Sequence, residues 1–502
     1  MHVIPKGKMT FSLSATFASN CLNFCNKEKV ASRLRITFLT GIHIFFSIGI
    51  LISNGFAQTS FERSLDVISG AAHTGIKGME LPDSSLLVVG CVADSSTRQK
   101  ICLLWTNPYG DTLRSVKLQP PTLREKAYDA LHKVSGEIVV AGSAEDSTSS
   151  DALVMQLDAA GNILWRHQQG TSLSNERFNS LSQTQSGNIV AAGRAVRIQT
   201  NSYYLKAELL QSTGVVSWSK EWRTRLGEIN SVMESPDSSV FFCGYLLDFG
   251  DTSGSMFLMK VNAAGDSLWT KKYFGSGWAT GNSILILPDG LLIAGATSYS
   301  SLLAGDHFLV RTNFNGDTLW TRRIGSVNAD EKIVDVAGTP DNCYILCGNA
   351  QSNLELIKTD TLGNAEWIHD YNSGDALAKS VCSTRDSGYF AVGSSGLSTG
   401  LPFFYLVKTD ANGGILLGGT LTEQRPNEIR FYPNPSNGHL HFMPAELFSM
   451  EVRDVSGKLI YRQDKCSDAI DLTFLASGAY FLFARSSNGD FMQGKLLLST
   501  ER

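Results

Sequence analysis

The sequence predicts an all-β chain: a β-propeller of about seven four-stranded blades followed by a small C-terminal antiparallel β-sandwich. An apolar strand that ends in glycine recurs seven times, at steps close to 51 residues. A turn glycine recurs seven times at the same period, and in five repeats a tryptophan follows four residues later. Repetition at this length, with four short strands per unit and no helical period, is typical of propeller blades.

Composition places the chain among folded, soluble proteins. Its 502 residues exceed one ordinary core, and 43% are hydrophobic while 18% are charged. The net charge of -4 leaves no basic footprint, so we expect no nucleic-acid partner. We expect a monomer.

Residues 1–57 are interpreted as a signal-peptide region. Basic residues from Lys27 to Arg35 precede an apolar run at 36–52, and Gly55-Phe56-Ala57 offers a cleavage site before Gln58. A retained membrane anchor is the alternative, because the run is close to the length that spans a bilayer. The first interpretation predicts Sec-dependent export through the periplasm.

Residues 58–424 form the predicted propeller, with six or eight blades as the alternatives to seven. The glycines that end the apolar strands are Gly90, Gly142, Gly193, Gly244, Gly295, Gly348 and Gly393. These strands are apolar at consecutive positions, which indicates burial on both faces. One extra strand, at 61–70, precedes the first complete unit and is expected to complete the last blade and close the ring.

Three repeated features are expected to be structural. The tryptophans are interpreted as packing between blades instead of as sugar platforms. The Asp158, Asp360 and Asp410 turns differ in spacing from the Asp-box of sialidases and are interpreted as hydrogen-bonding their own backbone. Four basic residues, each five before a turn glycine, are expected on a solvated outer hairpin: Lys260, Arg311, Lys358 and Lys408.

Cysteine usage argues against a zinc site or a disulfide scaffold. Seven cysteines remain after the signal region, with no C-x-x-C pair. Cys243 and Cys347 are expected to be buried, whereas a Cys91–Cys102 disulfide is left open because only geometry decides it.

Residues 425–502 form a second domain after a polar linker. Its motif residues are Tyr432, Pro433, Asn434, Pro435, Gly438, Gly457, Lys458, Gly478 and Tyr480. This pattern resembles the type A C-terminal sorting domain of the type IX (Por) secretion system of Bacteroidota. The resemblance implies a type IX machinery partner, export across the outer membrane, and release or surface attachment. An unrelated β-sandwich is the alternative.

The blades resemble uncharacterised propeller repeats of secreted proteins from the same bacteria, on text such as KTDTLGNAEWIHDY at 358–371. That resemblance implies the fold and no activity.

One blade-specific pattern is a candidate site. Acid–base neighbours precede the landmark glycine by sixteen to seventeen residues in three units: Glu125, Lys126, Glu176, Arg177, Glu331 and Lys332. They enter the strands that carry Asp129, Asn179, Asn230, Asn282 and Asp335. If those strands are innermost, the side chains approach the central funnel, where propellers bind ligands. Solvated or locally paired charges are the alternative.

The leading hypothesis is a secreted or cell-surface, non-enzymatic propeller that binds glycan or protein, as in adhesion. No nucleophile elbow, zincin, P-loop or EF-hand motif occurs, and we expect no catalytic residue, metal or cofactor. A secreted glycan hydrolase or lyase is the first alternative; it requires an Arg cluster beside two carboxylates. A purely structural surface scaffold is the second.

Overall fold

A computed structural model of the chain describes residues 59–93, 99–119, 124–273, 277–298, 305–325, 331–371, 375–415, 430–432, 436, 438–443, 447–454, 458–464, 469–486 and 491–498. The predicted signal region, 1–57, and the predicted linker, 421–428, lie outside these residues. Among the described residues, no helix has the length and apolar character needed to cross a membrane.

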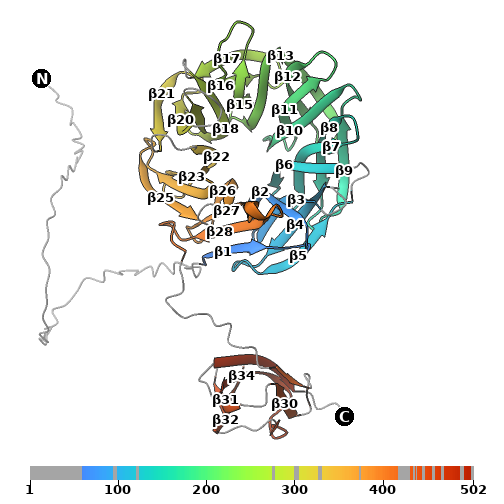
Figure 1. Cartoon of the computed structure of the whole chain (residues 1–502), viewed down its shortest axis with the longest axis vertical. Helices are drawn as coiled ribbons and strands as arrows, with labels where there is room; N and C mark the ends of the chain where they lie inside the picture. The colour runs from blue at the N-terminus through green and yellow to red at the C-terminus, as the bar shows by residue number, and fades with distance from the viewer. Residues whose placement is uncertain are drawn as a thin grey trace, which may run out of the picture. The chain divides into compact units, whose positions relative to one another are not determined.

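Seven four-stranded antiparallel sheets are arranged in a ring, which confirms the all-β propeller class (Figure 1). Their inner strands line a central channel. The first three blades are β2 (Ala72–Glu80), β3 (Leu86–Ala93), β4 (Gln99–Thr106), β5 (Thr112–Lys117); β6 (Arg124–His132), β7 (Ile138–Glu145), β8 (Ser150–Leu157), β9 (Ile163–Gln169); and β10 (Ser174–Gln183), β11 (Ile189–Arg197), β12 (Ser202–Leu210), β13 (Val216–Thr224). A single parallel bridge, Asn175 to Ser150, links the second and third.

Three more blades follow in the same order. They are β14 (Leu226–Glu234), β15 (Val240–Leu247), β16 (Ser255–Val261), β17 (Ser267–Tyr273); β18 (Trp278–Leu287), β19 (Gly290–Ser298), β20 (Asp306–Thr312), β21 (Thr318–Ile324); and β22 (Glu331–Gly338), β23 (Tyr344–Ala350), β24 (Asn353–Thr359), β25 (Ala365–Tyr371). In each blade the first strand lies nearest the channel and the fourth lies outside (Figure 1).

The seventh blade closes the ring with the N-terminal strand, as expected. It consists of β26 (Ala376–Ser383), β27 (Tyr389–Ser395), β28 (Phe403–Thr409) and β1 (Phe61–Leu65), with a 3-10 turn, η1 (Leu397–Thr399), before β28. Strand β1 pairs with β28 from Phe61–Lys408 to Leu65–Phe404. The sequence repeat begins with the strand that carries the tryptophan. In the structure this strand is the outermost strand of the preceding blade, so repeats and blades are offset by one strand.

The repeated glycines and tryptophans join neighbouring blades. Trp165 of β9 packs on the turn glycine Gly214 of the next blade, and its indole nitrogen donates to the carbonyl of Ser212 at 2.9 Å. Trp320 packs on Gly363 in the same manner. The Asp158 carboxylate accepts hydrogen bonds from the backbone nitrogens of its own turn, at 2.9 and 2.8 Å. Both features have the structural roles expected of them.

The basic residues assigned to a solvated hairpin are instead enclosed, so that expectation was wrong. Arg311, Lys358 and Lys408 are buried, and Lys260 keeps 13% of its side chain exposed. Each pairs with an aspartate in the turn between the first two strands of its own blade: Asp237, Asp289, Asp341 and Asp386. A buried ammonium or guanidinium group needs a counter-charge, and this turn supplies it.

The cysteines within the described residues are free thiols. Cys91 pairs across the hairpin with Ile101, and Cys102 pairs with Gly90. The two thiols belong to different core clusters on opposite faces of the blade, so they form no disulfide. Cys243 and Cys347 are buried, as expected.

The C-terminal residues form two antiparallel sheets. One contains β29 (Arg430–Tyr432), β30 (His439–Met443) and β33 (Ala469–Asp471); the other contains β32 (Leu459–Asp464), β31 (Leu447–Asp454), β34 (Gly478–Ser486) and β35 (Phe491–Leu498). Their core is separate from that of the propeller and is formed by residues between Leu440 and Leu498. Leu482 belongs to this core, and Tyr480 packs against it.

Candidate functional site

The six predicted rim residues lie on innermost strands, but the structure separates each acid from its basic neighbour. Side chains alternate along a strand, so consecutive residues point in opposite directions. Glu125, Glu176 and Glu331 are therefore buried, at 1%, 3% and 6% exposure. Lys126, Arg177 and Lys332 keep contact with solvent. Of each predicted pair, the basic member is the one available to a ligand.

The buried glutamates serve the packing of the blades. Glu125 pairs with Arg166 of β9. Glu176 pairs with Arg197 at 2.8 Å and with Lys206 at 3.1 Å. Glu331 lies against Gly325. The ion pairs of Glu125 and Glu176 offset the cost of burying their carboxylates, so they favour a structural role for these two residues.

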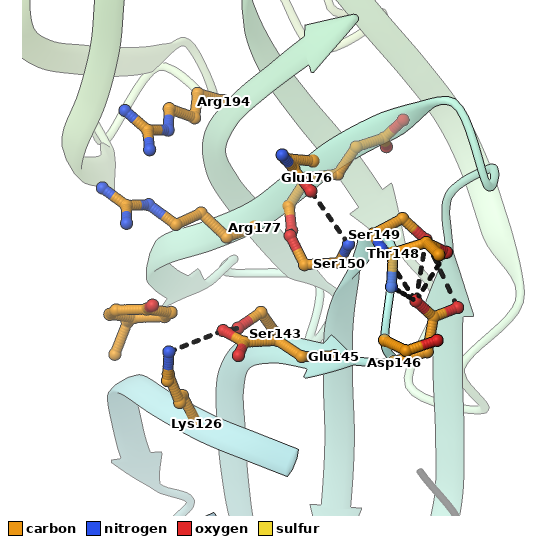
Figure 2. A pocket seen from close by; sticks show the side chains of 13 residues that line it. Lys126, Ser143, Glu145, Asp146, Thr148, Ser149, Ser150, Glu176, Arg177 and Arg194 are labelled. Carbon is orange, nitrogen blue, oxygen red and sulfur yellow. Dashed lines mark hydrogen bonds and ion pairs between the residues drawn. The ribbon is translucent and has the colours of Figure 1, made fainter. Parts of the chain in front are cut away.

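A polar cleft of about 360 Å³ opens between the second and third blades. It brings together Lys126 of β6, Arg177 of β10 and Arg194 of β11. Arg177 and Arg194 are directly opposed across the two strands, and Figure 2 shows their guanidinium groups extending side by side. The loop from Asp146 to Ser149 forms the other wall, where the Asp146 carboxylate accepts from the backbone nitrogens of Thr148 and Ser149.

Sequence reasoning missed Arg194. It directly follows the landmark Gly193, and the corresponding residues of the other blades are uncharged: Cys91, Ser143, Tyr245, Ala296, Asn349 and Ser394. An arginine in this one repeat was a detectable signal. The acid–base pattern lies before the glycine, whereas Arg194 lies after it on the second strand of the blade, which the cleft also uses.

The cleft holds its cations in ion pairs that leave donors available. Glu228 of β14 accepts from Arg177 Nη2 at 2.6 Å and lies 2.9 Å from Arg194 Nη1. Burial lowers the pKa of Arg177, but the charge of Glu228 outweighs it and the pKa is raised. Lys126 pairs with Glu145 at 2.7 Å. The buried Nε of Arg177 has no hydrogen-bond partner among the described residues.

An aromatic ring borders the charges. The guanidinium carbon of Arg177 lies 5.1 Å from the centroid of the Tyr128 ring, within cation–π range. Arginine held by a carboxylate and a ring is suited to a planar anionic group on a ligand. Glu145 and Glu228 are both engaged with cations, so neither is placed as a free proton donor.

The strands that carry the predicted polar residues line a second cavity, the central channel, of about 450 Å³. Each innermost strand contains a one-residue bulge, and the bulged residues are Ile76, Tyr128, Asn179, Asn230, Asn282, Val334 and Lys379. Asp129 and Asp335 follow the bulge by one residue. Sequence reasoning grouped them with the asparagines, because the bulge is invisible in the repeat.

The two aspartates join blades to one another. Asp129 accepts from the backbone nitrogen of Leu181 at 3.0 Å, and Asp335 accepts from that of Val381 at 3.2 Å. Lys77 donates to Asp335 at 3.1 Å. Burial lowers the pKa of Lys77, but the nearby Asp335 and Asp129 raise it overall. Among the described residues, no group of three or more His, Cys, Asp or Glu side chains is placed to hold a metal.

The motif residues of the C-terminal domain occupy strand ends and turns. Gly438 has φ +110°, and a Cβ there would lie 2.7 Å from Thr473. The backbone nitrogen of Lys458 donates to Asp454 at 3.1 Å, and the Tyr480 hydroxyl donates to the Ala476 carbonyl at 2.9 Å. Gly478 begins β34 and Tyr432 ends β29. Pro433, Asn434, Pro435 and Gly457 lie outside the described residues.

Residues 430–499 match the family described as the secretion system C-terminal sorting domain. This match confirms the resemblance of that segment. The tail indicates export and a surface or secreted location, and it implies interaction with the type IX secretion system. No curated protein matches the chain.

Solved structures similar to the chain include two propeller-containing proteins. PorZ, an essential bacterial surface component of the type IX secretion system of Porphyromonas gingivalis, is 11% identical; the match covers 83% of this chain and 69% of that one, with a TM-score of 0.31. The β-propeller domain of the Trilobed protease from Pyrococcus furiosus is 10% identical; the match covers 71% of this chain and 100% of that one, with a TM-score of 0.40.

Proposed function

We propose that this secreted propeller is a non-enzymatic binding module that holds a polar glycan or protein ligand in the cleft between the second and third blades. The observation that supports this most directly is the convergence of Lys126, Arg177 and Arg194 beside Tyr128. Adhesion at the surface of a Bacteroidota cell is the role that such binding would serve. A signal peptide cleaved after Ala57 would bring the chain to the periplasm by the Sec route.

The contents of the cleft bear on both alternatives. A scaffold would not require two arginines and a lysine to converge at one junction. At the position of Lys126 and Arg177 the other blades carry Thr74, Glu228, Thr280, Lys332 and Leu377. Of all the blades, the third alone has an arginine after its landmark glycine. A glycan hydrolase or lyase would use two carboxylates near an Arg cluster. Glu145 and Glu228 are two carboxylates near the arginines, as such an enzyme would require. Both form ion pairs, however, which favours ligand binding over proton transfer.

The test is a glycan and protein array probed with the chain from Gln58 onward, followed by turnover assays on every ligand bound. We expect binding without turnover. Arg194→Ala should weaken binding at least tenfold, because it removes a charge-assisted hydrogen bond worth about 1.5–3 kcal/mol. Lys220→Ala, on the outer strand of the same blade, is the control and should bind as the parent does. Turnover of a bound sugar would replace this proposal with the enzyme.

A further inference from the structure

The central channel has polar lining residues that the cleft does not use. A bulge re-aims one side chain of each innermost strand. On blades three, four and five those side chains are asparagines, at 179, 230 and 282, and on blade seven the side chain is Lys379. All four line the channel.

The asparagines face the channel with hydrogen-bond acceptors. The amide nitrogens of Asn179, Asn230 and Asn282 donate to backbone carbonyls of the next blade, at 2.8, 3.0 and 2.6 Å. Because the amide nitrogens already donate to the protein backbone, the side-chain oxygens are the groups that can bind a ligand. Those of Asn179 and Asn230 accept no hydrogen bond from any described residue. This side of the channel suits hydroxyl donors.

The opposite side carries Lys379, which lines the channel, and the charge of Lys332 on the neighbouring innermost strand acts on it. Lys379 and Lys332, on the neighbouring innermost strands β26 and β22, make no hydrogen bond or ion pair with any residue that the structure describes. Burial and the charge of Lys332 lower the pKa of Lys379. The Lys379 side chain is exposed where it lines the channel. By contrast, Lys77 in the same channel is neutralised by Asp335.

We propose that the central channel binds a sugar carrying one anionic group, a carboxylate or a sulfate. The anion would lie at Lys379 and Lys332, and ring hydroxyls would donate to the side-chain oxygens of Asn179 and Asn230. A bound anion relieves the repulsion between the two lysines and gives both a partner. The volume of about 450 Å³ falls in the range of small-ligand pockets. This site shares only Tyr128 with the cleft, and its existence does not depend on the proposed cleft function.

The test is titration calorimetry on the chain from Gln58 onward, with glucuronic acid, glucose 6-sulfate and glucose. We expect at least one acidic sugar to bind at least tenfold more tightly than glucose, because a charge-assisted contact is present only with the anion. Comparing glucuronic acid with glucose 6-sulfate shows whether the site prefers a carboxylate or a sulfate. Absence of binding by both acidic sugars would overturn the proposal, as would equal affinity for glucose.

Variants connect the binding to the site. Lys379→Gln should lower the affinity for the acidic sugar at least tenfold. It should leave the melting temperature unchanged or raise it, because it removes a repelled, partly desolvated charge. Lys332→Gln is the second variant and should weaken binding in the same direction. Lys220→Ala, on the outer strand of the third blade, is the control and should leave this binding intact. Binding that is lost in Arg194→Ala and kept in Lys379→Gln and Lys332→Gln would place the acidic sugar in the cleft and contradict the assignment. Unchanged affinity in both lysine variants would contradict the assignment.

Discussion

At the scale of single residues, the most informative feature is the buried cation near the end of the third strand. Lys408 keeps 2% of its side chain exposed and pairs with Asp386, which keeps 6%. The ammonium group also donates to the carbonyl and hydroxyl oxygens of Thr59, at 3.0 and 2.6 Å. One lysine therefore joins a turn of the last blade to the segment that leads into β1.

Replacing Lys408 should reveal the cost of an unpaired buried charge. Lys408→Met leaves Asp386 without its cation, and we expect a loss of about 3–5 kcal/mol in the free energy of unfolding. Urea titration measures it. Lys271→Met is the matched control, because its pair with Asp317 is 37% and 61% exposed and should contribute less than about 1 kcal/mol. Equal effects of the two substitutions would show that the Lys408 pair is no more stabilising than a surface one.

At the scale of elements, blades are joined by the contact between a tryptophan and the turn glycine of the following blade. Gly363 has φ +76°, and a Cβ added to it would lie 2.7 Å from the Trp320 ring. Glycine is required twice at this position, by the backbone conformation and by the close approach of the indole. The same contact recurs at Gly214, Gly265, Gly316 and Gly413.

The pair Gly363→Ala and Gly136→Ala separates these two requirements. Gly136 also has positive φ, at +99°, but a Cβ there would meet nothing within 4 Å. Gly136→Ala should therefore cost only the left-handed backbone term, about 1–2 kcal/mol. Gly363→Ala should cost a further 1–3 kcal/mol, roughly, for displacing Trp320. Denaturant unfolding of both variants measures the difference, and its absence would mean that the indole moves freely.

At the scale of the whole molecule, the ring is closed by residues far apart in the sequence. The Tyr405 hydroxyl donates to Glu62 at 2.6 Å across a separation of 343 residues. Among the described residues, the hydrophobic clusters of the propeller lie between Phe61 and Ile415 and include no residue of the C-terminal sheets. These separate cores support the proposed boundary at 424/425.

Truncation after residue 424 tests that boundary. Because no core is shared, the shortened chain should keep the cooperative unfolding of the propeller, with a free energy within about 0.5 kcal/mol of the full chain. Differential scanning calorimetry on both lengths, each beginning at Gln58, makes the comparison. A propeller that no longer unfolds cooperatively would place the boundary elsewhere.

The sequence by itself determined the repeat and the propeller class, favoured seven blades over six or eight, and carried the motif of the tail. These features follow from local rules: an apolar strand ending at glycine, a turn glycine before tryptophan, and the motif around Tyr432 and Gly478. The extra strand at 61–70 also predicted ring closure, because a ring without it would leave an incomplete blade.

Only the tertiary structure decided which side chains meet. Strand alternation turned Glu125 and Glu176 into the blades, and the bulges separated Asp129 from Asn179. The cleft joins Arg177 to Glu228, 51 residues away in the next blade. Such contacts depend on how neighbouring sheets pack, and the repeat in the sequence does not specify that packing. The physical reason is that local periodicity specifies each strand, whereas the site lies where different strands face one another.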